Sequence, residues 1–279
     1  RSIDEKTVDE LLAQEIKNNN KKIVVLDDDP TGVQTVHDIS VYTGWDADSL
    51  REAFAEENNL FYILTNSRGF TEAQTKAAHL EIADAVDRAA KEASRDYIFI
   101  SRSDSTLRGH YPLETRLLKE CYERNTGVKL DGEILCPFFK EGGRYTIGNV
   151  HYVKYGDELI PAHETEFAKD KTFGYTAENL PDYVEEKTAG EYKAKDVISI
   201  SLEDIRSMDF DKIESQLMSA KNFNKIIVNA IDYSDIKVFA VALFRAMNAG
   251  KMFMFRTAAA LVKVMGGVSD MPLLTISDM

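Results

Sequence analysis

Cysteine, proline and glycine are all scarce in this sequence. Its 279 residues include two cysteines, 6 prolines and 15 glycines. Two cysteines cannot form a disulfide framework or fill a zinc site alone, so we expect a reducing, cytoplasmic location. The low glycine and proline content excludes collagen-like and low-complexity chains. Because Cys121 lies on an apolar helical stripe and Cys136 ends an apolar segment, we expect both in the core.

Long apolar runs and an excess of basic residues are also missing. The longest uncharged stretch, residues 58–67, is far shorter than the roughly 18 residues of a membrane-spanning helix. Lysine and arginine number 34 against 47 aspartates and glutamates, which gives a net charge of −13. Such a charge repels phosphate backbones, and no local basic stripe offsets it. We therefore expect neither nucleic acid nor a membrane as a partner.

Short apolar, β-branched segments alternate with longer helical patterns, which is typical of a parallel α/β sheet. The expected fold is a mostly parallel sheet flanked by helices in three Rossmann-like layers. The predicted strands are 22–26, 39–43, 60–65, 97–100, 133–136, 197–201, 225–228 and 252–255. The predicted helices are 47–57, 71–94, 112–124, 210–220, 234–248 and 257–264.

Two of the predicted helices begin with a helix-capping sequence, and one long segment breaks the alternation of strands and helices. Thr71 with Gln74, and Ser49 with Glu52, have the spacing of capping boxes. We expect His79 to be solvated on its helix. Residues 138–192 are rich in glycine, tyrosine and charge, with little periodic hydrophobicity, which predicts an irregular insertion. No repeat or flexible linker divides the chain, so we expect residues 1–279 to form one domain.

Polar residues follow five of the predicted strands. In an open parallel sheet, ligands bind beyond the carboxyl ends of the strands, so these residues are the candidate site. They include carboxylates, hydroxyls and arginines. The strand-end segments are 27–32, 66–68, 101–110, 138–144 and 256–257.

Each of these residues also has a plain structural explanation. Any one of Asp27, Asp28 and Asp29 could cap a helix or lie in an exposed turn, since aspartate favours both. The alternative is a general base or metal-linked carboxylate that nearby arginines balance. Arg102 and Arg108 could be surface residues, or they could grip an anionic ligand through two-pronged hydrogen bonds. Their clustering favours the functional interpretation.

Several long and unusual motifs resemble the N-terminal domain of the four-carbon acid sugar kinases. They are spread over nearly the whole chain. The motifs are LDDDPTGVQTV at 26–36, TNSR at 65–68, SRSDSTLRGH at 101–110, PFFKEGGRY at 137–145, HYV at 151–153, ETEFAKDKTFGY at 164–175 and FRTAA at 255–259.

This resemblance implies ATP-dependent phosphorylation of a small sugar acid such as a threonate, erythronate or 3-oxo-tetronate. It implies Asp28 or Asp29 as the catalytic base, and Gly143, Arg144 and Arg256 at the phosphoryl-facing cleft. It also implies a set of substrate-binding residues: Thr31, Arg68, Ser101, Arg102, Ser103, Asp104, Ser105, Thr106 and Arg108.

ATP and Mg²⁺ are expected mainly on a C-terminal nucleotide-binding domain that this sequence does not contain. The chain has neither a G-x-x-x-x-G-K-[ST] nor a G-x-G-x-x-G motif, and no metal-ligand spacing. We therefore expect the fragment alone to be inactive. Its own nucleotide domain and a further copy of the chain are candidate protein partners. The residues around 141–175 resemble a variant branch of the family, which leaves the particular sugar acid and its stereoisomer open.

Two other functions remain as alternatives. Asp27-x-Asp29 after an apolar strand resembles the first motif of haloacid-dehalogenase-type phosphatases, with Asp27 as nucleophile and Asp29 as acid/base. That mechanism needs Mg²⁺ on a later acidic pair, for which Asp232 and Asp235 are the loose fit. The other alternative is a non-catalytic module that binds a sugar acid.

Overall fold

The centre of the molecule is an eight-stranded, wholly parallel β-sheet. The computed structural model describes residues 2–29 and 39–267. The strands follow the order β2-β3-β1-β4-β11-β5-β10-β9, and every neighbouring pair is parallel. Their bounds are β1 Lys22–Asp27, β2 Val41–Tyr42, β3 Leu60–Leu64, β4 Tyr97–Arg102, β5 Gly132–Cys136, β9 Ile198–Ile200, β10 Asn224–Val228 and β11 Phe253–Thr257.

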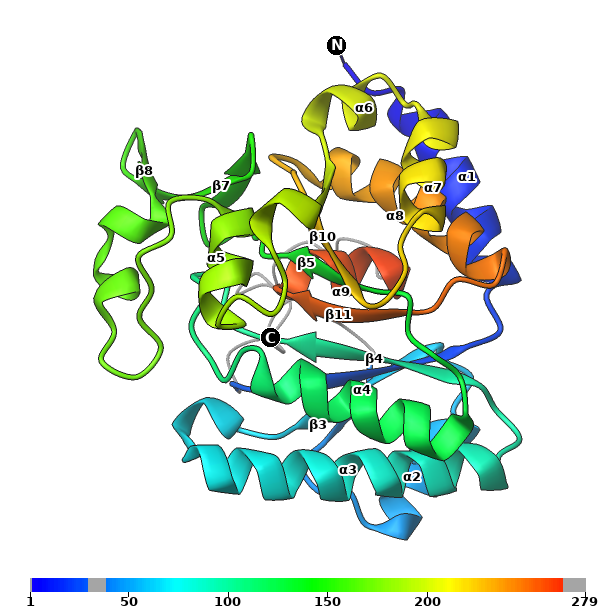
Figure 1. The fold of residues 1–279 in the computed structure, drawn as a ribbon. Helices are drawn as coiled ribbons and strands as arrows, with labels where there is room; N and C mark the ends of the chain where they lie inside the picture. Colours follow the sequence, from blue (N-terminus) through cyan, green and yellow to red (C-terminus); the bar gives the residue numbers. More distant parts are fainter. Residues whose placement is uncertain (1, 30–38, 268–279) are drawn as a thin grey trace, which may run out of the picture.

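Helices cover both faces of this sheet, which confirms the predicted three-layer α/β fold (Figure 1). One layer holds α2 (Ala47–Ala55), α3 (Glu72–Glu92) and α4 (Leu113–Thr126). The opposite layer holds α1 (Glu5–Asn18), α6 (Leu202–Arg206), α7 (Phe210–Met218), α8 (Tyr233–Asn248) and α9 (Ala259–Met265). Apolar residues of both layers pack on the sheet in one core.

The insertion between β5 and β9 contains more regular structure than the sequence indicates. It forms a second, antiparallel sheet of β6 (Arg144–Ile147), β7 (Val150–Tyr155) and β8 (Glu158–Pro161), followed by α5 (Leu180–Lys187). The insertion has its own small core, which includes Val153, Tyr175 and Tyr183. This core also contains Leu107, from the loop after β4, and Leu135, near the end of β5, so the insertion packs against the carboxyl ends of the large sheet's strands.

All eight predicted strands are present, but some element ends and one cap differ from prediction. β4 and β11 continue through polar residues to Arg102 and Thr257, because these residues keep their ladder pairing. The Thr71–Gln74 capping box is confirmed. The predicted Ser49–Glu52 capping box is wrong. Asp46 is the N-cap of α2, and its side chain accepts a hydrogen bond from the Ser49 N–H. α1, α5 and α6 were not predicted.

Both cysteines are buried, as predicted, whereas the prediction for His79 is wrong. His79 is 1% exposed, because α3 packs between α2 and α4 as well as on the sheet. Such a helix buries more than one stripe. Among the described residues, no helix is long and apolar enough to cross a membrane.

Candidate functional site

The strand order places a topological switch point between β1 and β4. From β1 the chain continues to β2 and β3 on one side, and β4 then pairs with the other side of β1. At such a point the flanking connections diverge, and the crevice beyond the strand ends is where open α/β sheets bind ligands. The residues after β1, β3 and β4 are therefore those most exposed to a ligand.

At the end of β1, one arginine joins two aspartates. Arg68, which follows β3, donates from Nη2 to Asp28 Oδ1 at 2.6 Å and from Nη1 to Asp29 Oδ2 at 2.7 Å. Asp28 is only 3% exposed. Burial raises the pKa of Asp28 to about 7, although the Arg68 charge opposes that rise. A carboxyl group with such a pKa can accept a proton near neutral pH.

Asp27 and Arg102 form a separate pair beneath this one. Arg102 Nη1 lies 3.0 Å from Asp27 Oδ1, and the Asp27 side chain is fully buried. Burial raises the pKa of Asp27, and the Arg102 charge opposes it. Because Arg102 is bound to this internal carboxylate, its geometry favours a structural role over the predicted contact with substrate.

The loop after β4 carries a third carboxylate with different partners. Asp104 accepts hydrogen bonds from Arg108 Nε, at 2.6 Å, and from the Thr106 hydroxyl. Burial acts to raise the pKa of Asp104, but these two hydrogen bonds, together with the charges of Arg68 and Arg108, outweigh it and lower the pKa below its ordinary value. Asp104 is therefore a stable anion that holds Arg108 in place.

Arg144 approaches the same loop from the insertion. Its guanidinium lies 5.6 Å from the centre of the Phe167 ring, and Arg108 lies 4.9 Å from the centre of the same ring. Within residues 2–29 and 39–267, Arg144 has no carboxylate partner, and its Nε is buried without a hydrogen bond. Gly143, at φ +70°, makes the turn that leads into β6. Two guanidiniums on one ring form a cationic wall that suits an anionic ligand.

Arg256 completes the cluster from β11. It is 5% exposed, donates from Nη2 to the Arg108 carbonyl at 3.0 Å, and stacks on Tyr111 at 4.9 Å. Gly109, at φ +118°, lies between Arg256 and Asp28. A Cβ there would meet Asp28 Oδ2 at 3.2 Å and Arg256 Nη2 at 3.3 Å. The backbone can pass between these two charged groups only because this residue has no side chain.

A cavity of about 430 Å³ opens beside this cluster. It lies between the start of α3, the 109–113 segment and the insertion. Gly109 links the cavity to Asp28, and His110 Nε2 lies 2.9 Å from the Phe70 carbonyl in its wall. The remaining wall includes Thr71, Glu72, Phe173, Lys187 and Thr188.

The structure brings most of the predicted site residues to one edge of the sheet. Asp28, Asp29, Arg68, Asp104 and Arg108 meet there in the pairs described above, and Arg144 and Arg256 border them. Ser101, in β4, and Ser103, just after it, are nearly fully buried. Thr106 is also buried, and its hydroxyl donates a hydrogen bond to Asp104. Ser105 offers its carbonyl rather than its hydroxyl to a neighbour, His151. Thr31 lies outside the described residues.

Sequence reasoning missed a buried residue behind the cluster. Glu114, at the start of α4, is 1% exposed and accepts from the Ser67 hydroxyl at 2.6 Å. Its other oxygen lies 3.8 Å from Arg256 Nη1, and its negative charge contributes to the raised pKa of Asp28. A glutamate in a helical pattern is usually solvated, so only tertiary packing reveals it.

The phosphatase arrangement is not formed. Asp232 and Asp235 cap α8, which follows β10, and Asp235 is bound to Arg206. β10 lies four strand spacings from β1, or about 19 Å across the sheet. These aspartates therefore cannot share one metal ion with Asp27.

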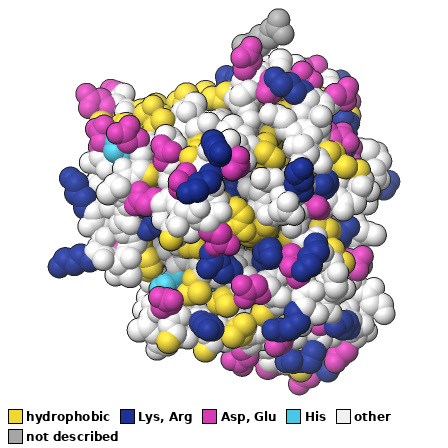
Figure 2. Space-filling model, viewed as in Figure 1, with side chains coloured by type: hydrophobic (Ala, Val, Ile, Leu, Met, Phe, Trp, Pro, Cys, Tyr) yellow, Lys and Arg dark blue, Asp and Glu magenta, His cyan; other side chains and the backbone are white. Residues whose placement is uncertain are grey.

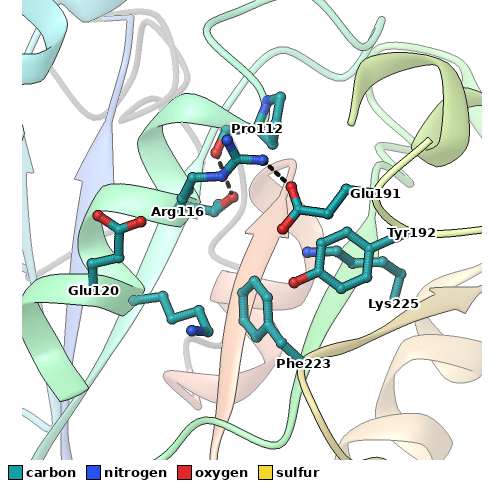
Figure 3. Close-up of a pocket in the computed structure, with 9 residues that line it drawn as sticks. Pro112, Arg116, Glu120, Glu191, Tyr192, Phe223 and Lys225 are labelled. Carbon is teal, nitrogen blue, oxygen red and sulfur yellow. Dashed lines mark hydrogen bonds and ion pairs between the residues drawn. The ribbon is translucent and has the colours of Figure 1, made fainter. Parts of the chain in front are cut away.

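A second cavity, of about 220 Å³, lies between α4 and the start of β10 (Figure 3). Four of its charged side chains, those of Arg116, Lys119, Glu191 and Lys225, already have ion-pair partners. Arg116 binds Glu191 across the opening, and Lys225 binds buried Glu133 beneath the Tyr192 ring. Figure 2 shows basic and acidic side chains interspersed over the visible face, without a continuous basic area. Neither this cavity nor the surface charge offers a better candidate site than the carboxyl ends of the strands.

The fold and this edge define a parallel α/β domain with a charged ligand crevice, and comparison with known proteins identifies its family. A family model described as a sugar-binding N-terminal domain matches residues 23–265. The chain belongs to this family, which confirms the resemblance that the motifs indicated. No curated protein is significantly similar to the chain in sequence.

Solved structures share the fold at low sequence identity. A Bordetella bronchiseptica protein of the DUF1537 family, solved as a domain-swapped dimer with bound citrate, is 19% identical with a TM-score of 0.61, over 88% of this chain and 55% of that one. A Haemophilus influenzae DUF1537 protein is 18% identical with a TM-score of 0.54, over 87% and 55%. The chain thus spans about 55% of the length of these relatives.

Proposed function

We propose that this chain is the substrate-binding part of an ATP-dependent kinase that phosphorylates a four-carbon sugar acid. The observation that carries the proposal is the pairing, at one crevice, of a buried aspartate with a raised pKa and a wall of arginines. A sugar acid needs both groups, because one end is a carboxylate and the other end bears hydroxyls. Membership of a sugar-binding family supports the ligand class.

In this proposal Asp28 is the base. Its pKa of about 7 lets it take the proton of the reacting hydroxyl, which makes that oxygen the nucleophile. Arg68 holds the Asp28 carboxylate in place through two hydrogen bonds, and Asp29 shares the same guanidinium. Phosphoryl transfer relies mainly on positioning and charge stabilisation, so one fixed carboxylate is sufficient protein chemistry on the acceptor side.

Arg108 and Arg144 bind the anionic parts of the reactants. Both guanidiniums lie on Phe167, and Asp104 fixes the orientation of Arg108. The Bordetella bronchiseptica protein was solved with bound citrate, which is compatible with a carboxylate ligand for a protein of this fold. The partial coverage of the relatives supports a second domain in the complete protein, and the dimer in that structure supports self-association.

The described residues do not fit ATP or Mg²⁺. They contain no group of three or more histidines, cysteines, aspartates and glutamates that could hold a metal ion. The sequence has no glycine-rich phosphate loop. In this proposal the nucleotide therefore binds to a further domain of the complete protein.

The proposal is tested by ligand binding to this domain. Thermal shift and calorimetry with erythronate, threonate and 3-oxo-tetronate should show at least one acid that raises the melting temperature, since a ligand of the folded state stabilises it. ATP should not bind. Micromolar ATP affinity, or no response to any four-carbon acid, would contradict the proposal. Binding without phosphoryl transfer in the full-length protein would instead identify a sugar-acid-binding module.

A further inference from the structure

The loop after β4 is held by an unusual set of hydrogen bonds. Four successive backbone carbonyls, those of residues 105–108, each accept one hydrogen bond from a side chain of a different segment. The donors are His151 Nε2 to Ser105 at 2.6 Å, Tyr175 to Thr106 at 3.2 Å, Tyr183 to Leu107 at 2.9 Å and Arg256 Nη2 to Arg108 at 3.0 Å.

Three of these four donors belong to the insertion. His151 lies on β7, Tyr175 precedes α5, and Tyr183 lies on α5. All three are at most 5% exposed. Hydrogen bonds that are shielded from solvent in this way fix the orientation of the carbonyls, because breaking one leaves a buried polar group unpaired.

The tautomer of His151 is also fixed. Burial lowers the pKa of His151 to about 4, so the ring is neutral near pH 7. Nε2 donates to the Ser105 carbonyl, and Nδ1 therefore accepts from the Thr146 hydroxyl at 2.9 Å. Both ring nitrogens are thus used, and the ring serves to hold the loop rather than to transfer protons.

Because the carbonyls of residues 105–108 are held by these hydrogen bonds, the orientation of the loop's N–H groups is also fixed. In a planar trans peptide the N–H of the next residue is opposite to the carbonyl. With the Ser105, Leu107 and Arg108 carbonyls turned to the insertion and β11, the N–H groups of the following residues turn away. Within the described part of the chain, the N–H groups of Thr106, Arg108 and Gly109 donate no hydrogen bond.

The loop that carries these N–H groups borders the candidate site. Gly109 lies against Asp28 Oδ2, and the loop's own Asp104 and Arg108 side chains form one wall of the crevice. Leu107, at φ +73°, gives the loop the left-handed residue typical of concave anion-binding nests.

We propose that the insertion is a positioning device for this loop and that the N–H groups of Thr106, Arg108 and Gly109 bind the carboxylate of the sugar acid. This inference rests on the proposed function and deepens it. It places the carboxylate end of the substrate on residues 106–109, so that a hydroxyl faces Asp28. His151, Tyr175 and Tyr183 are positioning residues that act through the loop.

The test uses tyrosine-to-phenylalanine variants, which remove one hydroxyl and keep the ring packing. Tyr175→Phe, Tyr183→Phe and the double variant are compared with Tyr97→Phe. Tyr97 is a matched control, because it is 4% exposed and its hydroxyl donates to Asp87 at 3.4 Å from the opposite end of β4. Calorimetry with erythronate and threonate and thermal melts are recorded for each protein.

We expect Tyr175→Phe and Tyr183→Phe each to lose about ten-fold in affinity and the double variant more. Each should also melt somewhat below the wild type, because a buried carbonyl loses its partner, but the affinity loss should be measurable in the folded protein. Tyr97→Phe should keep wild-type affinity. In the amide NMR spectrum of the wild type, erythronate should shift the Thr106, Arg108 and Gly109 signals most.

The outcomes separate this inference from the proposed function. Wild-type affinity in the double variant, or signal shifts confined to other residues, would overturn the positioning role while the sugar-acid function stands. A wild-type protein that binds none of erythronate, threonate and 3-oxo-tetronate would overturn both.

Discussion

Each side of the candidate crevice holds a largely buried aspartate paired with an arginine at the same distance, yet the two carboxyl groups differ in their pKa. The Arg68–Asp28 and Arg108–Asp104 pairs both measure 2.6 Å. Burial raises the pKa of Asp28 to about 7, whereas the effect of burial on Asp104 is outweighed by its hydrogen bonds and the nearby arginine charges, so that its pKa is lowered. The separation of an ion pair therefore does not determine protonation.

The difference comes from the surroundings of each pair. Asp28 lies among strand ends, is 3% exposed, and has the negative charge of Glu114 nearby. Asp104 lies on a loop, has 10% of its side chain exposed, and receives an additional hydrogen bond from Thr106. One side of the crevice is thus suited to accept a proton, and the other is suited to remain charged and orient an arginine. Five substitutions test this contrast, ordered by their expected effect on stability.

Arg68→Ala should have the largest effect. It leaves Asp28 buried without its charge partner, which should lower the free energy of unfolding by about 3–5 kcal/mol at pH 8. Chemical denaturation measures this loss. The control is Arg51→Ala, which removes an exposed pair with Asp48 at 2.7 Å and should cost less than about 1 kcal/mol. Equal losses in the two variants would show that the Arg68 pair is no stronger than a surface pair.

Gly109→Ala should cost about 1–3 kcal/mol in unfolding free energy, because φ +118° strains any residue with a Cβ. The added carbon would also press on Asp28 and Arg256, so ligand affinity should fall. Gly127→Ala is the control: Gly127 has φ +74° at the end of α4, with open space around its Cβ position. It should lose stability and keep affinity. Unchanged affinity in Gly109→Ala would separate Gly109 from the site.

The dependence of stability on pH should have opposite signs for the two aspartates. An unfolded aspartate titrates near 3.9, so from about pH 4 to pH 7 folded Asp28 retains a proton that the unfolded chain has lost. Asp28 therefore makes stability fall as pH rises through this window, by at most about 1.4 kcal/mol per pH unit. Asp28→Asn should remove that slope in thermal melts.

Asp104 should behave in the opposite way. Because its pKa is lowered, it contributes stability above about pH 4 that is lost as pH falls through its folded pKa. Asp104→Asn should therefore reduce stability at pH 7 and flatten the acid limb of the melting curve. Identical pH profiles for the Asp28 and Asp104 variants would remove the contrast between the two sides.

Arg108→Lys should have the smallest effect on stability, below about 1 kcal/mol, because the side chain is 29% exposed. Lysine keeps the charge but loses the planar guanidinium, so sugar-acid affinity should fall about ten- to a hundred-fold. Calorimetry and melts on the same variant separate the two effects. A destabilised protein with intact affinity would assign Arg108 to loop structure alone. Arg116→Lys, on an exposed pair with Glu191, is the matched control.

The sequence alone determined the large sheet, the order of its strands along the chain and the residues at its carboxyl ends. Buried parallel strands are continuous apolar runs, and polar residues mark where they end. All eight strands of the sheet could therefore be predicted, starting with residues 22–26. The prediction failed where polar residues stay inside: Arg102 continues β4 because Asp27 neutralises it, a partner 75 residues away. His79 was wrong for a similar reason, since neighbouring helices bury its face of α3.

Only the tertiary structure decided which charged groups pair and what the insertion does. Local sequence cannot show that Asp28 is buried beside Glu114, so it left the choice of base open between Asp28 and Asp29. It also cannot show that His151, Tyr175 and Tyr183 converge on successive carbonyls of one loop, because these contacts join residues 46 to 76 positions apart. Local patterns record which residues are apolar or polar, whereas a pKa or a loop's orientation depends on groups that meet only when distant segments pack together.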